Sequence, residues 1–436
     1  MQQDTRKAII GWAMYDWANS AFATTVMAAF FPIFFKKFWS AGVDPVVSTA
    51  KLGMANSIAG MVVALSAPIL GAIADRGGAK KKFLMFFAFI GVVMTASLYM
   101  VSKGNWGMAV AVYVLATVGF SGGNIFYDSL ITAVSSERRM DFVSALGFSM
   151  GYLGGGILFA FNVWMTLNPA AFGLADAGAA VRCAFLSVAC WWAIFSIPVF
   201  LFVKEPGAKE GKDAFDAVSA GLRQLGHTFQ EIRHLKMIFL FLIAYWLYID
   251  GVDTIIRMAL DYGMSIGFET NDLILALLIT QFVGFPSAVA FGYLGGKIGT
   301  KRAIYITIAV YLIVTIYAAF MTHKHEFYML AVVIGMVQGG IQALSRSYFA
   351  RIIPVNKSAE FFGFYNLIGK FSVVIGPFIL GITALVVRSM GYSSTFASRI
   401  SITSIAILFI AGGVILRFVD EQTGKKEAQY LSRTVR

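Results

Sequence analysis

Charged residues are scarce in this sequence. Asp, Glu, Lys and Arg make up 13% of its 436 residues, whereas hydrophobic residues make up 58%. Soluble globular proteins carry about 25% charged residues. Together with a mean hydropathy of +0.74, this composition excludes an ordinary soluble protein and predicts an integral membrane protein.

Cysteine is also scarce. The two cysteines, Cys183 and Cys190, lie seven residues apart in one apolar run, a spacing that predicts neither a redox pair nor a zinc site. The sequence contains no Walker phosphate loop and no His-Glu-x-x-His pair. We therefore expect no metal, no cofactor and no enzymatic activity.

Long apolar runs are what the sequence has in abundance. Each is long enough to cross a bilayer, which takes about 20 helical residues. The first run is too long for the hydrophobic part of a signal peptide, so we interpret it as a span. The sequence thus predicts an all-α membrane protein of twelve transmembrane helices. The twelve runs lie near residues 9–35, 52–74, 83–102, 106–134, 142–167, 181–203, 237–263, 271–296, 303–322, 326–350, 359–388 and 396–418.

Basic residues such as Lys80–Lys82 recur in alternate loops, which explains the net charge of +12 without nucleic acid. This bias places both termini in the cytoplasm. The longest loop has apolar residues spaced by three and four, as in an amphipathic helix on the inner membrane face. We expect a six-helix bundle at 1–203, this linker at 204–236, a second six-helix bundle at 237–419 and a cytoplasmic tail at 420–436.

The two halves of the chain resemble each other in three places. WAMYDWANS at 12–20 matches WLYIDGVDT at 246–254, and GAIADRGGAKK at 71–81 matches GYLGGKIGTKR at 292–302. A third match places DSLITAV, which begins at Asp128, opposite RSYFARI, which begins at Arg346. Because the matches keep their order along the chain, they indicate an internal repeat of six helices, a pattern known from transporters.

Polar residues lie inside the apolar runs. A charge in hydrocarbon costs several kcal/mol, so we expect these side chains to face a wet cavity or one another. Three aromatic neighbours, Tyr15, Trp17 and Trp246, are candidates to line the same cavity. The polar candidates for substrate binding or coupling are Asp16, Asn19, Asn124, Asp128, Asp250, Asp253, Arg257, Gln338, Gln342, Arg346, Asn366 and Lys370.

Two roles remain open for the intramembrane charges. In the first role, an acid is a titrating group or a base holds a substrate carboxylate, since desolvation and nearby charges shift pKa values. Alternatively, the charges form a latch that sets the balance between two conformations. Asp16 and Asp128 suit either role, with Arg346 as their expected partner. The more central group favours substrate binding or coupling: Asp250, Asp253 and Arg257.

The sequence resembles the major facilitator superfamily. GAIADRGGAKK is similar to that superfamily's signature loop between helices 2 and 3, although Ala79 stands where a basic residue is usual. GYLGGKIGTKR is similar to the weaker copy between helices 8 and 9, with Gly296 in place of the acid. WAMYDWANSAFATTV and AYWLYIDGVDTIIRMALDYG resemble the branch of fungal autophagy-related vacuolar effluxers and their bacterial relatives. The loop residues that carry over, as a motif for conformational change, are Gly71, Asp75, Arg76, Gly78, Lys80 and Lys81.

The resemblance implies two pseudo-symmetric six-helix bundles, with helices 1, 4, 7 and 10 lining a central cavity. It implies secondary transport by alternating access of a small polar or zwitterionic metabolite, with amino acids favoured. The intramembrane acids add proton coupling as a hypothesis. The alternatives are a lipid or peptide transporter of the same fold and a transporter-like sensor that moves nothing. We expect a monomer in the bacterial inner membrane that contacts lipids, substrate and protons but no nucleic acid.

Overall fold

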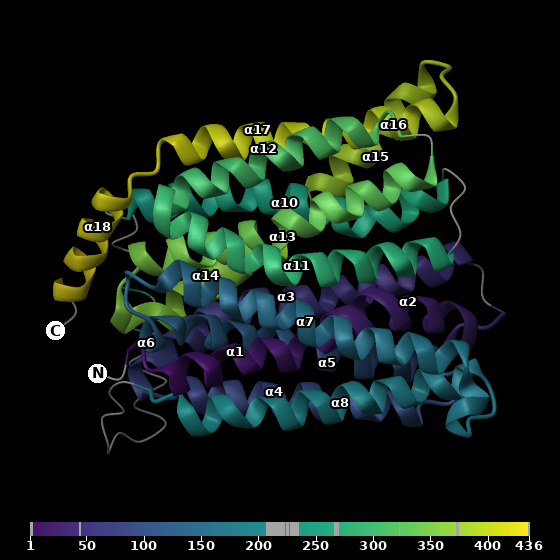
Figure 1. Cartoon of the computed structure of the whole chain (residues 1–436), viewed down its shortest axis with the longest axis horizontal. Helices are drawn as coiled ribbons and strands as arrows, with labels where there is room; N and C mark the ends of the chain where they lie inside the picture. Colours follow the sequence, from purple (N-terminus) through teal and green to yellow (C-terminus); the bar gives the residue numbers. More distant parts are fainter. Residues whose placement is uncertain are drawn as a thin grey trace. The chain divides into compact units, whose positions relative to one another are not determined.

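The computed structural model describes residues 3–42, 45–205, 223, 226, 235–265, 270–321, 323–371 and 375–434. Every regular element in these ranges is a helix (Figure 1). Eleven of the described helices are long and apolar enough to cross a membrane. The remaining apolar run is divided between two shorter helices, so the predicted all-α membrane fold is confirmed.

The first half of the chain forms six spans. The first of them, Arg6–Trp39, begins as an α-helix and continues through two π-helical segments, Phe22–Phe30 and Phe35–Trp39. π-Helical turns are rare and often occur at functional sites. The α-helices of this half are α1 (Arg6–Ala21), α2 (Phe31–Phe34), α3 (Pro45–Gly77), α4 (Lys80–Ser97), α5 (Trp106–Ser129), α6 (Ile131–Val134), α7 (Met140–Leu167) and α8 (Ala177–Phe202).

The second half repeats this arrangement and adds one helix at its end. The predicted linker helix at 204–236 lies almost wholly outside the described residues. The predicted tail at 420–436 contains a helix, α18, which packs against α10 and α13. The helices of this half are α10 (Lys236–Ser265), α11 (Thr270–Ile298), α12 (Thr300–Ala318), α13 (Lys324–Ile352), α14 (Ser358–Phe371), α15 (Ile375–Ser389), α16 (Ser394–Ser404), α17 (Ala406–Arg417) and α18 (Glu421–Thr434).

The chain packs into two compact units. Unit 1 comprises Met1–Ser136, Met150–Leu225 and Ser358–Asn366, and unit 2 comprises Glu137–Ser149, Gly226–Lys357 and Leu367–Arg436. Each unit therefore includes a short segment from the other half of the sequence. The first turns of α7 belong to unit 2, and the first turns of α14 belong to unit 1.

Glycines set how closely the helices of unit 1 approach one another. Gly119 of α5 lies so near Gly91 of α4 that a Cβ would overlap the backbone there. Gly151 and Gly154 of α7 pack in the same way on α1, where Gly154 contacts the backbone and ring of Trp17. The glycine-rich stretch in α7 thus serves close helix packing, as small residues do in membrane bundles.

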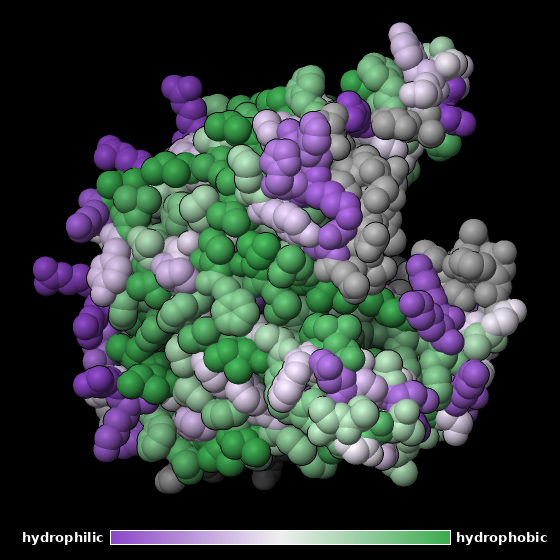
Figure 2. Space-filling model, turned by 45° about the vertical axis from the view of Figure 1, so that its right-hand side comes forward, coloured by the Kyte–Doolittle hydropathy of each residue, from purple (hydrophilic) through white to green (hydrophobic). Residues whose placement is uncertain are grey.

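Large apolar side chains remain exposed along the spans. Phe89, Ile313 and Leu385 each leave 66–71% of their surface uncovered. Hydrophobic residues also cover much of the face shown in Figure 2. Exposed patches of this size are expected where a helix bundle faces lipid.

Candidate functional site

A cluster of buried polar side chains lies in unit 1 between α1 and α5. Asn19 donates from Nδ2 to Asn124 Oδ1 at 2.6 Å. Asn366, from the α14 segment of this unit, donates to Asp128 Oδ2 at 3.3 Å. Asp16 and Asp128 are each only 8% exposed. The structure therefore brings together five of the polar residues predicted from sequence, on three helices of one unit.

Aromatic rings surround this cluster. Tyr127 donates its hydroxyl to Asp16 Oδ2 at 2.7 Å. Its ring stacks on Trp12, with centroids 4.5 Å apart, and tilts against Tyr15 at 5.1 Å. The indole of Trp12 donates to the Tyr127 carbonyl at 2.9 Å. The Asp16 carboxylate is thus held in a fixed place by rings that are themselves packed, which is the preorganisation that a binding site needs.

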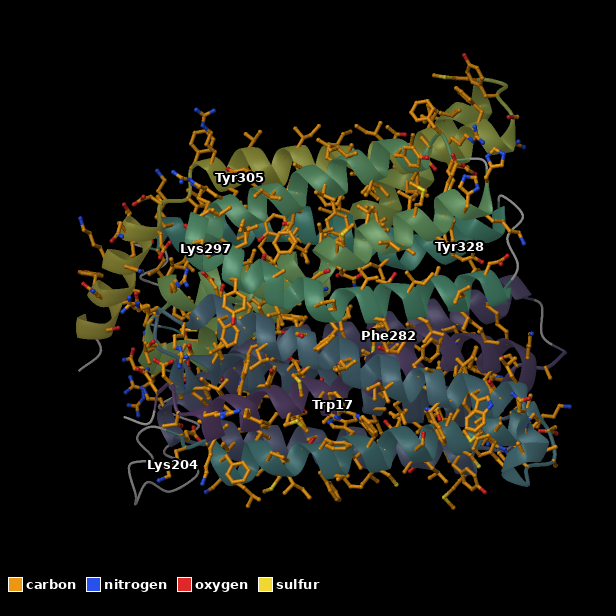
Figure 3. The ribbon with its side chains drawn as sticks, in the orientation of Figure 1. Trp17, Lys204, Phe282, Lys297, Tyr305 and Tyr328 are labelled. Carbon is orange, nitrogen blue, oxygen red and sulfur yellow. The ribbon has the colours of Figure 1, made fainter. Side chains whose placement is uncertain are left out.

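Trp17 lies elsewhere in unit 1 (Figure 3). Its ring stacks on Trp191 of α8 at 5.5 Å, and its carbonyl accepts the Trp191 indole N–H at 3.1 Å. The structure therefore places Trp17 in the packing of α1 against α7 and α8. A cavity role for Trp17 remains a prediction.

Asp250 in unit 2 holds the start of a helix. Its carboxylate accepts the backbone N–H groups of Ile375 at 3.1 Å and Gly376 at 3.0 Å, the first residues of α15. The hydroxyl of Thr254 also donates to it, at 3.2 Å. Asp250 has no exposed surface. A carboxylate in this position satisfies N–H groups that a helix start leaves unpaired and opposes the positive end of the helix dipole.

Further predicted residues of unit 2 lie on α10, α13 and α14. Arg257 lies in α10 and Lys370 in α14, but their side chains are outside the described part of the chain. Gln338 and Gln342 lie one turn apart on α13 and are half-buried. Trp246 is also half-buried, and its indole N–H has no hydrogen-bond partner among the described residues. Their contribution to a site remains a prediction.

Arg346 binds the first turns of α7 within unit 2. It donates from Nε to the Ser144 hydroxyl at 2.9 Å and from Nη2 to the Ser144 carbonyl at 2.8 Å. Its guanidinium lies 4.2 Å from the centre of the Phe148 ring, a cation–π distance. Only 2% of Arg346 is exposed. The repeat match placed Arg346 opposite Asp128, and in the structure each contacts a segment from the other half of the chain.

The acid of the first loop motif contacts the start of another helix. Asp75 accepts the N–H groups of Ala359 at 3.1 Å and Glu360 at 2.8 Å, which begin α14, and pairs with Lys80 at 2.8 Å. A Cβ on Gly71 would overlap the Ala359 carbonyl. The motif therefore joins α3 to the first turn of α14 inside unit 1. Of the remaining motif residues, Gly78 turns the chain with φ of 56° and Arg76 is exposed.

The sequence match pairs Lys80 of the first loop motif with Lys301 of the second, but the contacts of the lysines indicate a different pairing. Lys81 donates to the carbonyls of Phe200 and Val203, each at 2.7 Å, at the end of α8. Lys301 does the same at the end of α17, bonding the carbonyls of Arg417 and Val419. Lys81, and not Lys80, is therefore the counterpart of Lys301. The loop before α4 is one residue longer than the loop before α12, which shifts the correspondence.

Asp141 is a buried acid that the sequence patterns missed. It lies in the first turn of α7, is 3% exposed and pairs with Arg351 Nη2 at 2.9 Å. The hydroxyl of Thr300 donates to it at 2.9 Å, and that of Ser347 donates to its other oxygen. The sequence did hold one hint. The second loop motif has Gly296 in place of an acid, so its basic and hydroxyl residues need a carboxylate from another part of the chain.

One stretch matches the Gly-x-Ser-x-Gly sequence motif of serine hydrolases. Residues Gly147–Gly151 run Gly-Phe-Ser-Met-Gly, whereas a serine nucleophile of this spelling sits on a sharp strand-to-helix turn. Here the stretch lies inside the continuous helix α7, and Ser149 donates its hydroxyl to the Phe285 carbonyl at 2.8 Å. The stretch therefore serves helix packing.

Comparisons with known proteins agree with this architecture. The family model described as "Vacuole effluxer Atg22 like" matches residues 45–137 and 132–429. The chain belongs to the Atg22-like family. It is 40% identical over 427 residues to the uncharacterised MFS-type transporter YxiO of Bacillus subtilis, covering 96% of both chains. It is 20% identical to autophagy-related protein 22 of Eremothecium gossypii, covering 98% of this chain and 94% of the relative.

Solved structures show the same fold. The proton:xylose symporter XylE aligns with a TM-score of 0.68 and 14% identity over 98% of this chain and 97% of its own. The human organic anion transporter MFSD10 aligns with a TM-score of 0.69 and 14% identity over 95% and 100%. The predicted major facilitator fold is therefore confirmed. This Atg22-like chain is an MFS-type transporter embedded in a membrane by its apolar helices.

Proposed function

We propose that this protein is a secondary transporter of small zwitterionic metabolites, with amino acids as the first class. The observation that carries the proposal is the buried cluster of unit 1, where Asp16, Asn19, Asn124 and Asp128 meet within the membrane-spanning helices. Intramembrane acids are rare and mark substrate or ion pathways. The family's description as vacuole effluxers supports export of small solutes.

The chemistry of the cluster suits an ammonium group. An ammonium has three donors and no acceptor, and it needs carboxylate or amide oxygens around it. The α1–α5 cluster supplies both kinds of oxygen. A guanidinium matches the geometry of a substrate carboxylate, and Arg346 is a buried guanidinium within unit 2.

Proton coupling is the energy source we propose. Asp250 is buried and held by two backbone N–H groups and one hydroxyl, which are neutral donors. Neutral donors compensate a carboxylate less than a basic partner does, so such a group is suited to take up a proton when its surroundings change. We place the protein in a bacterial inner membrane, as a monomer with cytoplasmic termini.

The first test is a ligand screen of the purified protein in detergent. Amino acids, dipeptides, sugars, nucleosides and lysolipids are added separately, and the unfolding transition is recorded. A ligand at a hundredfold excess over its Kd stabilises the folded state by about 2.7 kcal/mol. We expect a shift with amino acids that Asp16→Asn abolishes and that Glu137→Gln, at an exposed acid, leaves intact.

Uptake into proteoliposomes then measures transport of the ligand that shifts the transition. A pH gradient should accelerate it, and Asp250→Asn should remove that acceleration. A shift with lysolipids alone would instead support the lipid-transporting alternative. A screen that stays flat at high concentration for every class would refute the amino-acid proposal.

A further inference from the structure

The second loop motif lacks an acid in its own sequence. Gly296 stands where the first motif has Asp75. In unit 1 the carboxylate of Asp75 performs two tasks, because it accepts N–H groups of the α14 segment and pairs with Lys80. The second loop motif keeps its glycines and ends in the basic residues Lys301 and Arg302. It therefore retains groups that could bind a carboxylate.

In unit 2 the missing carboxylate comes from α7. A Cβ on Gly295 would lie 3.2 Å from Asp141 Oδ2, and a Cβ on Gly292 would press on Ala145 one turn further along α7. The glycines of the second loop therefore leave room for the first turns of α7, as Gly71 does for α14. We propose that Asp141 is the acid of the second loop motif, supplied by α7, and that it holds α7 in one state of the transport cycle.

A single carboxylate, that of Asp141, serves three polar partners around the second loop motif. Arg351, Thr300 and Ser347 come from the end of α13 and the start of α12, and all of them bind this buried group. Removing one partner from a buried ion pair is strongly destabilising because the other charge is left without compensation. Asp141 is thus a positioning residue: neutralising it should free the first turns of α7 from α11, α12 and α13.

A second set of contacts lies further along the same face of α7. Ser144 binds Arg346 and donates its hydroxyl to the Ala343 carbonyl at 2.7 Å. Ser149 donates to the Phe285 carbonyl of α11. These contacts and the Asp141 pair lie on the segment Glu137–Ser149. Ser149 lies two turns from Asp141 and has no exposed surface in this state. Loss of the Asp141–Arg351 pair should therefore increase the exposure of position 149.

The test measures how fast a thiol at position 149 reacts. Ser149→Cys is introduced after Cys183→Ala and Cys190→Ala, and the membrane-embedded protein is treated with a small water-soluble methanethiosulfonate. Loss of one hydrogen bond to a charged group favours the released state of α7 by at least about tenfold. We therefore expect Asp141→Asn to accelerate the reaction about tenfold. Arg351→Gln should act in the same direction. Glu137→Gln, an exposed acid four residues earlier, should leave the rate unchanged.

A control reporter separates local release from general unfolding. Ser196→Cys lies in α8 of unit 1 and is 4% exposed, so its reactivity should stay at background in every variant. Exchanging the charges, with Asp141→Arg and Arg351→Asp together, should restore slow reaction at position 149, because the hydroxyls of Thr300 and Ser347 accept as well as donate.

An unchanged rate at position 149 in both Asp141→Asn and Arg351→Gln would overturn the proposal. Equal acceleration at position 196 would do so too, since it would show general loss of structure. If Asp141→Asn does not fold, Arg351→Gln and Thr300→Val decide the question alone. The inference rests on the proposed function only in taking α7 to move during transport. The thiol assay needs no substrate, so a failed ligand screen would leave its result intact.

Discussion

A single methyl group added at Gly376 should disturb the contact between α15 and Asp250. A Cβ there would overlap Thr254 Oγ1 and lie 2.7 Å from Asp250 Oδ1. Gly376→Ala must therefore push the first turn of α15 away from the Asp250 carboxylate. That carboxylate now accepts two backbone N–H groups, Ile375 at 3.1 Å and Gly376 at 3.0 Å.

The magnitude follows from two contributions. A methyl group forced into a packed site costs about 1–3 kcal/mol. Each hydrogen bond to a charged group contributes about 1.5–3 kcal/mol, and the shift should weaken both without breaking both. We therefore expect Gly376→Ala to lower the free energy of unfolding by about 3 kcal/mol. The assay is the unfolding transition in detergent, together with transport in proteoliposomes.

Gly381 provides a matched control in the same helix. A Cβ at Gly381 would meet nothing within 4 Å, and replacing glycine by alanine in a helix interior stabilises by up to about 1 kcal/mol. Gly381→Ala should thus be neutral or stabilising. If Gly376→Ala proved as stable and as active as Gly381→Ala, Asp250 would not be holding α15 in the way described here.

Three further predictions concern Gly71 and Lys81 of the first loop motif and Glu427 of α18. Gly71→Ala should lower both the free energy of unfolding and transport, measured as uptake per amount of folded protein, because its Cβ would overlap the Ala359 carbonyl. Lys81→Ala should lower the free energy of unfolding by about 1–2 kcal/mol through lost carbonyl contacts, whereas the exposed Lys82→Ala should not. Burial raises the pKa of Glu427 above its usual 4.5. Docking of α18 should therefore be strongest below that usual value and weaken as the pH rises through the raised pKa, which limited proteolysis of α18 would show, with Glu427→Gln insensitive to pH.

The sequence predicted the helices well because long apolar runs are a local signal. Spacing along the chain puts Asn124 and Asp128, which are four residues apart, on one helix face, but it does not show that Asn124 contacts Asn19 of α1. The partners of these residues depend on how helices pack, which no local pattern records. The sequence therefore favoured Asp250 for substrate or coupling but gave no sign that it holds the start of α15.

Asp141 and Lys81 were harder for the same reason. Asp141 precedes a span and looks like an ordinary loop acid until α7 is seen packed on Gly292 and Gly295. The sequence match paired Lys80 with Lys301, because a short motif alignment cannot detect one extra loop residue. The contacts at the ends of α8 and α17 correct that pairing.

The exchange of segments between the two units has a consequence for how the protein is assembled. Unit 1 includes Ser358–Asn366 from the second half of the chain, and unit 2 includes Glu137–Ser149 from the first half. Each half synthesised alone would lack part of its own unit, because Asp75 would lose the Glu360 N–H and Arg351 would lose the Asp141 carboxylate. Two separately expressed halves should therefore accumulate only when produced together. In a single chain, the first half completes its unit only after the ribosome has made α14.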